Sequence, residues 1–568
     1  MYSRPALSRR IRRVICGATL IVPVLWGGRG TAQTTATTVL SPKQANDSSV
    51  GSWRPSSSAW DRLRLRQLRG DSTTLDVGLM RGPSLRNARQ NGMQWLSPEI
   101  LVAGNAGYPL SSNDGALWSG RGLNASVGAG VTFRRGAWHL VIAPEMTFSG
   151  NTPFETNENS HYFSPAVPAD RADKAAFLDP WYVRPFSADV PRRFGASSFL
   201  TVTTGQSGLW YAAGPIEVGA TSENMWWGPG VRNAILMSDN AAGIPRLELR
   251  STQPWSTSVG VFAARWFVGA LQESKYFDDD PHDDVRSLAA AVVTWRPAFQ
   301  PWLTIGLERS VFATATGYGQ VPLRWFDVFA NTGHPNDHAP TDSSLTPGGR
   351  DQLIGIFGRW VFPTDGVETY FEWARQELPR SFKELVTSPT NGHGYTIGLQ
   401  WLRLVPPGMP ALRIQAEITT LEQSSSFRDH NVGVFYTSRR VLQGYTQDGQ
   451  PIGASIGPGS SSQWLAFDRV APTWSWGITF NRIRWNEDVH SIYSWPGYAG
   501  YCNHDVSLIP GVRGSRLTSR GIIGAEVMFN DRHNVFFQNV GGCKAGSGDQ
   551  VDNTSPNLRI MLSPSLHW

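Results

Sequence analysis

Apolar and polar residues alternate with a period of two along several stretches of this chain. In 411–421 one parity is aliphatic, at Leu412, Ile414, Ala416 and Ile418. The other parity of the same stretch is polar, at Arg413, Gln415, Glu417 and Thr419. The same alternation recurs in 367–373, 474–482 and 520–529. Side chains of a β-strand point to opposite faces in turn, so each stretch is predicted to be a strand with one apolar face.

The last segment shows the same pattern, with Leu558, Ile560 and Leu562 on one parity and an aromatic residue, Trp568, at the end. An aromatic residue at the end of the final strand is typical of outer-membrane barrels, which carry aromatic girdles at both membrane interfaces. We therefore expect this segment to close a barrel wall.

A soluble β-sandwich also alternates, so periodicity alone leaves both architectures open. The terminal aromatic residue and the 24 Trp favour the membrane form. The predicted fold class is all-β: a large antiparallel transmembrane β-barrel of about 16–18 strands with a small N-terminal helical periplasmic segment, since about 25 residues are needed per strand and connection.

Basic Arg9, Arg10, Arg12 and Arg13 precede an apolar run in 14–26, which predicts a signal peptide over 1–32. Residues 33–117 are expected to form a lead and a helical periplasmic segment, with its helix at 60–68, and 118–568 the barrel. The expected location is the outer membrane of a diderm bacterium. Its expected partners there are membrane lipid and, during biogenesis, the barrel assembly machinery.

The net charge of +6 is not gathered into a Lys/Arg block beyond the N-terminus, so nucleic acid is excluded as a partner. Two cysteines remain after the signal peptide, Cys502 and Cys543. Export to an oxidising compartment makes them a candidate disulfide.

The most distinctive run is Trp226-Trp227-Gly228-Pro229, followed by Asp239-Asn240 and then Pro245. Its tight bend and paired indoles suit either packing or stacking on a sugar ring. The run resembles the Wzi family of capsule assembly proteins, in which a Trp-Trp-Gly-Pro segment precedes a Ser-Asn-Asn-Ala-like segment. Asp239 departs from that pattern, because the family more often has Asn there.

The resemblance implies an outer-membrane barrel that binds or anchors capsular or other surface polysaccharide without catalysis and without a cofactor. From the aromatic and polar loop side chains we expect ligand-binding residues among Trp226, Trp227, Asn240, Tyr445 and Gln450. The alternative functions are an outer-membrane channel for small solutes and an outer-membrane hydrolase of glycans or lipids.

Other motifs favour simpler interpretations, and neither catalytic nor metal-binding residues are predicted. Ser455 lies in a Gly-x-Ser-x-Gly pattern, but within a Gly/Ser/Pro-rich loop rather than between a strand and a helix. The acidic run 278–284 could bind a hard cation but lacks the spacing of a calcium loop, so a solvated turn is favoured. Glu368, Glu372 and Glu417 are interpreted as a lumenal charge lattice rather than as a glycosidase pair.

Overall fold

The computed structural model describes residues 53–56, 58–71, 79–83, 91–154, 187–278, 280–330, 349–376, 382–387, 389–423, 434–488, 504–519, 521–537 and 553–564. The predicted signal peptide, Cys502, Cys543 and Trp568 lie outside these residues. The signal and disulfide therefore stay predictions.

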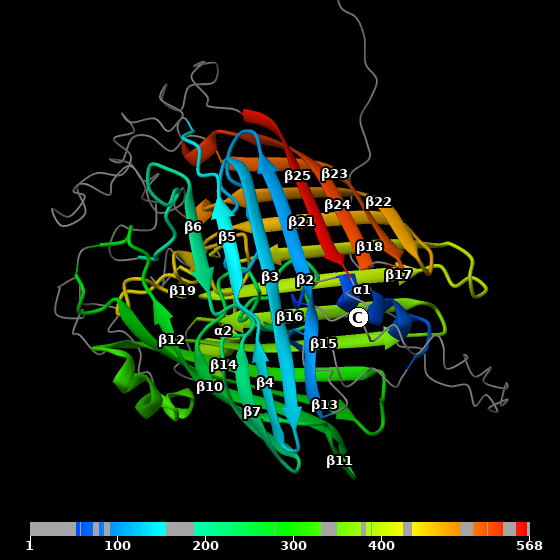
Figure 1. The fold of residues 1–568 in the computed structure, drawn as a ribbon, viewed down its shortest axis with the longest axis horizontal. Coiled ribbons are helices and arrows are strands. Elements are labelled where there is room, and N and C mark those ends of the chain that lie inside the picture. Colours follow the sequence, from blue (N-terminus) through cyan, green and yellow to red (C-terminus); the bar gives the residue numbers. More distant parts are fainter. Residues whose placement is uncertain are drawn as a thin grey trace, which may run out of the picture. The chain divides into compact units, whose positions relative to one another are not determined.

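Antiparallel strands form one closed barrel (Figure 1). Three positions in the wall are each occupied by two short strands lying end to end: β4 with β5, β6 with β7, and β10 with β11. When each couple is counted as one strand, the described wall has 18 strands, as predicted. The first half of the wall comprises β2 (Gly92–Asn105), β3 (Gly122–Arg135), β4 (Trp138–Ile142), β5 (Glu145–Ser149), β6 (Phe199–Thr203), β7 (Gly208–Ala213), β8 (Ile216–Thr221), β10 (Arg246–Ser251), β11 (Trp255–Thr257), β12 (Gly260–Gln272) and β13 (Val285–Pro297). The second half comprises β14 (Leu303–Ala315), β15 (Arg350–Phe362), β16 (Val367–Arg375), β17 (His393–Leu402), β18 (Ala411–Thr420), β21 (Ser461–Val470), β22 (Trp474–Trp485), β23 (Asp505–Thr518), β24 (Gly521–His533) and β25 (Asn553–Pro564).

The remaining described elements lie outside the wall sheet. Two short two-stranded sheets are formed by β1 (Met80–Arg81) with β9 (Trp226–Trp227) and by β19 (Thr446–Gln447) with β20 (Gln450–Pro451). The helical elements are α1 (Ser58–Leu68), α2 (Phe382–Thr387), η6 (Tyr318–Arg324), η7 (Asp327–Phe329) and η10 (Val535–Phe537). Among the described residues, neither α-helix has the length and apolar character needed to cross a membrane.

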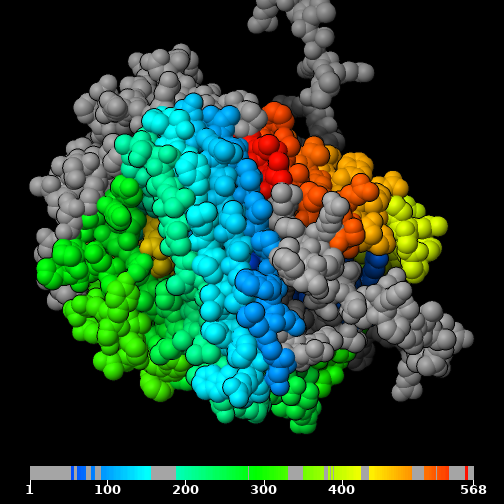
Figure 2. Space-filling model, viewed as in Figure 1, coloured from blue at the N-terminus to red at the C-terminus, as the bar shows by residue number. Residues whose placement is uncertain are grey.

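The barrel closes where β25 pairs with β2, in a register running from Ile100 opposite Leu562 to Asn105 opposite Asn557. Figure 2 shows the red end of the chain lying against the blue and cyan strands at this seam. The predicted role of the last segment as the closing strand is confirmed over its described residues.

Polar residues of the wall point inward and apolar residues outward. In β18 the inward Arg413, Gln415 and Glu417 are each at most 3% exposed, whereas the outward Ile418 is 46% exposed. The outward face of β22 repeats this with Trp476 at 54% and Phe480 at 44%. An apolar belt of this extent around a closed sheet is the outer surface of a barrel that faces hydrocarbon.

The helix α1 docks against one end of the barrel, as its low apolar content required. Leu65 and Leu68 pack against the strand ends at Val361, Leu402, Ala411 and Val470. Charged side chains fix the other side of the helix: Arg64 pairs with Glu368 at 2.5 Å, and Asp61 accepts from Arg413 at 2.7 Å. The predicted helix at 60–68 thus exists and is anchored by buried wall charges.

The predicted boundary between the N-terminal segment and the barrel at 117/118 is wrong. β2 already belongs to the wall, and it pairs with both β3 and β25. Its register shifts between Leu96 and Glu99, around Ser97 and Pro98. A bulge at a proline breaks the period of two, which is why the alternation does not mark this strand.

The outward face makes a direct prediction about stability in a bilayer. Phe480→Arg, near the middle of β22, is expected to lower the free energy of unfolding by about 2–4 kcal/mol, the cost of an Arg on the lipid face at the bilayer midplane. Urea unfolding in lipid vesicles measures this. Met409→Arg, in the exposed turn after β17, serves as the control and should be nearly neutral. Equal stability of the two variants would contradict a lipid-facing belt.

Candidate functional site

The lumen is occupied by residues 222–245, here called the lumenal plug, which connect β8 to β10. Two wall carboxylates hold its backbone. Glu417 of β18 accepts the N–H groups of Val231, Arg232 and Asn233 at 2.6, 3.0 and 2.9 Å. Glu372 of β16 accepts those of Gly230 and Ile235, both at 2.8 Å. Charge-assisted hydrogen bonds to backbone N–H groups are among the stronger kind, so the plug is fixed to the wall.

Trp226 and Trp227 form the β9 strand of the plug and pair with Arg81 and Met80. Both indoles are fully buried. The guanidinium of Arg81 lies 4.7 Å from the centre of the Trp226 ring, and Trp227 meets Phe267 edge-on at 5.8 Å. The two tryptophans therefore pack the plug against the wall.

The other three predicted residues join the plug to neighbouring segments. Tyr445 donates its hydroxyl to the carbonyl of Leu236 at 2.9 Å. The Asn240 amide donates to the carbonyl of Pro451 at 3.0 Å, and Gln450 reaches the carbonyl of Gly115 at 3.4 Å.

The structure thus brings all five candidate residues into one lumenal assembly, but as buried packing residues, each at most 6% exposed. In this conformation they hold the interior together. Contact between any of these five side chains and a glycan stays a prediction.

Asp239, where the sequence departs from the family pattern, ties the N-terminal residues to the plug. Its Oδ2 accepts the hydroxyl of Ser56 at 2.6 Å and the backbone N–H of Ser56 at 3.2 Å. Burial is the largest influence on this carboxyl and raises its pKa above the usual range, against the opposing effect of the bonds from Ser56. The side chain is an acceptor for Ser56, a role that a neutral Asn can share through its amide oxygen.

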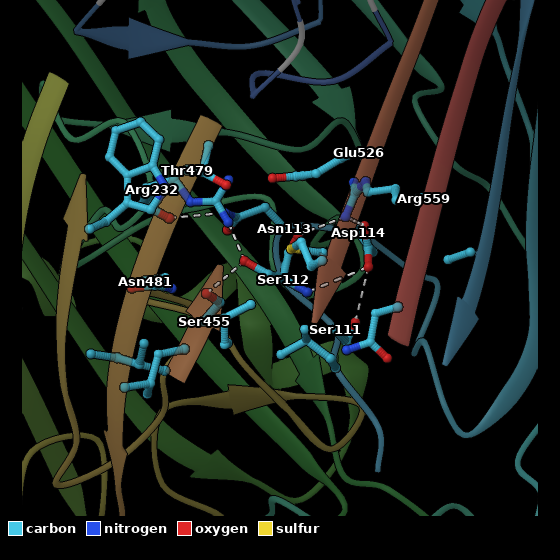
Figure 3. Close-up of a pocket in the computed structure, with 18 of the residues that line it drawn as sticks. Ser111, Ser112, Asn113, Asp114, Arg232, Ser455, Thr479, Asn481, Glu526 and Arg559 are labelled. Carbon is cyan, nitrogen blue, oxygen red and sulfur yellow. Dashed lines mark hydrogen bonds and ion pairs between the residues drawn. The ribbon is translucent and has the colours of Figure 1, made fainter. Parts of the chain in front are cut away.

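Beside the plug lies a cavity of about 200 Å³, here called the lumenal pocket (Figure 3). The plug forms one side, the connection between β2 and β3 another, and the inward faces of β2 and β21–β25 the rest. Its polar and charged lining consists of Ser56, Asn105, Ser111, Ser112, Asn113, Asp114, Arg232, Asn233, Ser455, Thr479, Asn481, Glu526, Asn557 and Arg559. Two indoles, Trp464 and Trp485, stand among the apolar lining residues.

Several buried amide atoms in the lumenal pocket have no hydrogen-bond partner among the described residues. Asn557 is 1% exposed, and both its Oδ1 and its Nδ2 lack a hydrogen bond. Asn481 Oδ1 and Asn113 Oδ1 are also unbonded. Buried polar groups are nearly always satisfied, so amides unbonded within the protein and lining one cavity indicate a polar ligand or ordered water there.

The charges around the pocket are of two kinds: Arg559 is paired with Asp114, whereas Arg232 and Glu526 have no ion-pair partner among the described residues. Arg559 forms an ion pair with Asp114 and donates to the carbonyl of Ser112 at 3.2 Å. The Arg232 guanidinium lies 5.6 Å from the Trp464 ring centre. Burial lowers the pKa of Arg232, and Glu526 opposes that shift. Figure 3 shows Arg232 and Glu526 on different sides of the space, with Arg559 turned toward Asp114. The pocket therefore presents a cation and a carboxylate along with neutral amides.

The motifs considered for catalysis have structural partners instead. Ser455 Oγ lies 3.0 Å from Ser112 Oγ and 3.4 Å from Asn233 Oδ1, and neither group is a general base. Glu368 pairs with Arg359 and Arg64, while Glu372 and Glu417 bind plug amides. These carboxylates form the lumenal lattice that the sequence pattern favoured.

The residues of the lumenal pocket were not among the candidates from the sequence. Thr479, Asn481, Glu526 and Arg559 all occupy the polar parity of predicted strands, so their inward direction was readable. The sequence did not show that these four side chains line one cavity, because that depends on which strands become neighbours. The serines and asparagines of 105–114 were missed because that segment was assigned to the N-terminal portion.

The fold and the pocket define a large transmembrane-type β-barrel with a plugged lumen and a polar cavity beside the plug. The sequence model of the family described as capsule assembly protein Wzi matches residues 94–467, more than half of the chain. The chain belongs to this family, as the resemblance in the sequence indicated. No curated protein matches it in sequence.

Among solved structures, Wzi of Escherichia coli is similar at a TM-score of 0.50 with 10% identity, covering 83% of this chain and 85% of that one. That protein is described as an outer-membrane protein involved in group 1 capsule assembly and as a carbohydrate-binding β-barrel. OccAB4 of Acinetobacter baumannii has a TM-score of 0.36 at 8% identity, covering 84% and 98%. OprB of Pseudomonas putida has 0.35 at 11%, covering 83% and 94%. The first likeness supports the barrel fold.

The anchoring of the plug predicts the effect of removing one carboxylate. Glu417→Ala leaves three plug amides and the Tyr370 hydroxyl, which donates to Glu417 at 2.8 Å, without their acceptor. At about 1–3 kcal/mol for each of these four buried groups, the free energy of unfolding is expected to fall by at least about 4 kcal/mol. Hydrogen exchange at Val231–Asn233 should accelerate in parallel.

The matched control is Glu422→Ala, whose carboxylate pairs with the half-buried Arg484 near the barrel rim. This substitution should lower the free energy of unfolding by about 1 kcal/mol or less, since partly exposed ion pairs contribute little to stability. Slow exchange at 231–233 in Glu417→Ala would show that the plug is held by other contacts.

Proposed function

We propose that this protein is an outer-membrane barrel that binds capsular or similar surface polysaccharide non-catalytically and so retains it at the cell surface. The lumenal pocket is the proposed contact for one sugar unit of the polymer. A cavity of about 200 Å³ is smaller than the ~300–1,000 Å³ of sites for drug-sized ligands, so it suits a single ring.

The observation that carries the proposal is the unbonded amide of Asn557. A sugar ring presents hydroxyl groups that both donate and accept, and an amide offers one acceptor and two donors. Asn481 and Glu526 add acceptors, and Arg232 adds a donor along the same cavity. Membership in a capsule assembly family makes a saccharide the ligand class that fits this lining.

Retention of a long polymer does not require tight binding at one pocket. Repeating units rebind at a high effective concentration, so many weak contacts add to a strong attachment. Binding without turnover is also what the pocket chemistry supports, because the groups around Ser455 are a hydroxyl and an amide.

The connections of the barrel support an orientation. Short turns such as 136–137, 214–215 and 471–473 lie at the end where α1 docks, and the long connections lie at the other end. In barrels of this class short turns face the periplasm and long loops face the exterior. We assign α1 to the periplasmic side and the long connections to the cell surface.

The lumenal plug weighs against the solute-channel alternative. Its backbone is bonded to the wall at β16 and β18, and its side chains pack in the main buried cluster with Phe267, Phe312 and Phe357. A lumen filled in this way is expected to pass far less ion current in a planar bilayer than an open barrel with the same number of strands.

Asn557→Leu separates binding from stability. Leucine has the branched shape of asparagine, with two methyl groups that the adjoining cavity can accommodate, and it removes two buried polar atoms that lack a partner among the described residues. The folded state should therefore keep or gain stability. Affinity for the polysaccharide should fall at least tenfold, about 1.4 kcal/mol. Surface plasmon resonance with purified polysaccharide and cell-surface retention in a complemented deletion strain measure this loss.

The matched control is Asn530→Leu. Asn530 is also an inward-facing buried residue of the closing strands with an unbonded amide oxygen, but it does not line the pocket. The Asn530→Leu variant should bind the polysaccharide with the affinity of the wild type. Full affinity in Asn557→Leu would place saccharide binding elsewhere on the protein.

A further inference from the structure

The acidic run of the sequence lies in 273–284, the connection between β12 and β13 at the end of the barrel that carries the long loops. The sequence favoured a solvated turn for this run. In the structure only part of it is solvated: Asp280 and Asp284 are exposed, whereas Asp278 and Asp283 turn inward with Glu273.

Carboxylate oxygens of Glu273, Asp278 and Asp283 all lie within 4.8 Å of one another. Oxygens on opposite sides of one Ca²⁺ are about 4.8 Å apart, because each Ca²⁺–oxygen bond is about 2.4 Å. Opposite oxygens around Mg²⁺ are only about 4.2 Å apart. The spacing allows all three carboxylates to reach one calcium ion.

A second observation comes from a different segment of the chain. Gln443 is fully buried, and its amide lies against the cluster, with Nε2 near Glu273 Oε2 at 2.5 Å and near the carbonyl of Asp283 at 3.4 Å. The Oε1 of the same amide has no hydrogen-bond partner among the described residues. Rotation of the amide by half a turn exchanges the two atoms and directs this unbonded oxygen at Glu273 and Asp283, where a cation accepts it as a further ligand.

The surroundings make the cluster strongly electronegative. Asp189 lies close enough to act on Glu273, which therefore faces a further carboxylate besides Asp278 and Asp283. The adjacent Arg286 is near enough to Glu273 and Asp283 to act on them electrostatically, but it donates hydrogen bonds to the backbone carbonyls of Gly444 and Gln272, at 2.9 and 2.8 Å. Lys275 in the same connection is exposed. The acidic side chains outnumber the cations around them, and a divalent cation supplies the missing positive charge.

We propose that Glu273, Asp278 and Asp283, with the amide oxygen of Gln443, bind one Ca²⁺ at the rim of the barrel. The ion joins the β12–β13 connection to the 434–460 segment. That segment inserts Tyr436 and Tyr445 into the lumen, where their hydroxyls donate to the plug carbonyls of Ile235 and Leu236. Calcium at this position therefore braces the outer side of the plug against the wall.

Terbium luminescence tests the proposal on the full-length protein in detergent after treatment with a chelator. Tb³⁺ replaces Ca²⁺ at oxygen sites, and Tyr276 in the same connection is close enough to sensitise it. We expect saturable emission that Ca²⁺ displaces and an equal concentration of Mg²⁺ does not. Glu273→Gln combined with Asp283→Asn should weaken Ca²⁺ competition at least tenfold, and Gln443→Leu severalfold.

The control is Asp284→Asn, which removes the same charge from the same connection at an exposed side chain outside the cluster. It should bind within twofold of the wild type. Absence of saturable emission, or equal losses in the control and the double variant, would overturn the proposal in favour of diffuse surface charge.

Thermal unfolding tests the site even if the double variant does not fold, because it is measured on the wild type and on a single variant. Calcium should raise the Tm of the wild type by several degrees, a chelator should reverse the rise, and Asp283→Asn alone should largely abolish it. A wild-type Tm that does not respond to Ca²⁺ would contradict the proposed site.

Discussion

Two carboxylates in the barrel wall determine how the interior is built. Glu372 and Glu417 accept five backbone N–H groups of the lumenal plug, which would otherwise be buried donors without acceptors. In return the plug supplies the donors that make two charges tolerable inside a protein, since a buried charge is costly unless it is hydrogen-bonded. Neither the wall nor the plug is satisfied alone. The position of Arg232, and with it one side of the lumenal pocket, follows from this exchange.

The same exchange of polar groups continues to the end of the barrel. Arg64 and Asp61 of α1 meet Glu368 and Arg413, whose neighbours on the wall are Arg359 and Asp468. Paired charges therefore link the docked helix to β16 and β18, the wall strands that also hold the plug. An interior of this kind is compatible with an outer surface that has almost no charge, because the chain places its ionic groups where other parts of the chain can meet them.

The wall of this barrel was largely predictable from the sequence, and its contents were not. Inward Glu417 and outward Ile418 are neighbours in the chain, so the strand period of two assigns their directions without tertiary information. The period fails at β2, where Pro98 accompanies a bulge, and at β23, where Pro510 follows Ile509. Family membership was visible in the Trp226–Pro229 run. The role of those tryptophans was not, because burial depends on contacts with Arg81 and Phe267 that no local pattern encodes. The sequence shows Asn557 only as a polar position on a strand. That its amide lacks a hydrogen-bond partner among the described residues can be seen only once the pairing of β25 with β2 is known.

The two strands that close the barrel also complete the lumenal pocket. Asn105 belongs to the first wall strand and Asn557 to the last, and both line the lumenal pocket. The lining of the cavity is therefore complete only when the first and last wall strands have paired. If the pocket is the proposed saccharide contact, a chain whose barrel is still open has no finished site for the polymer.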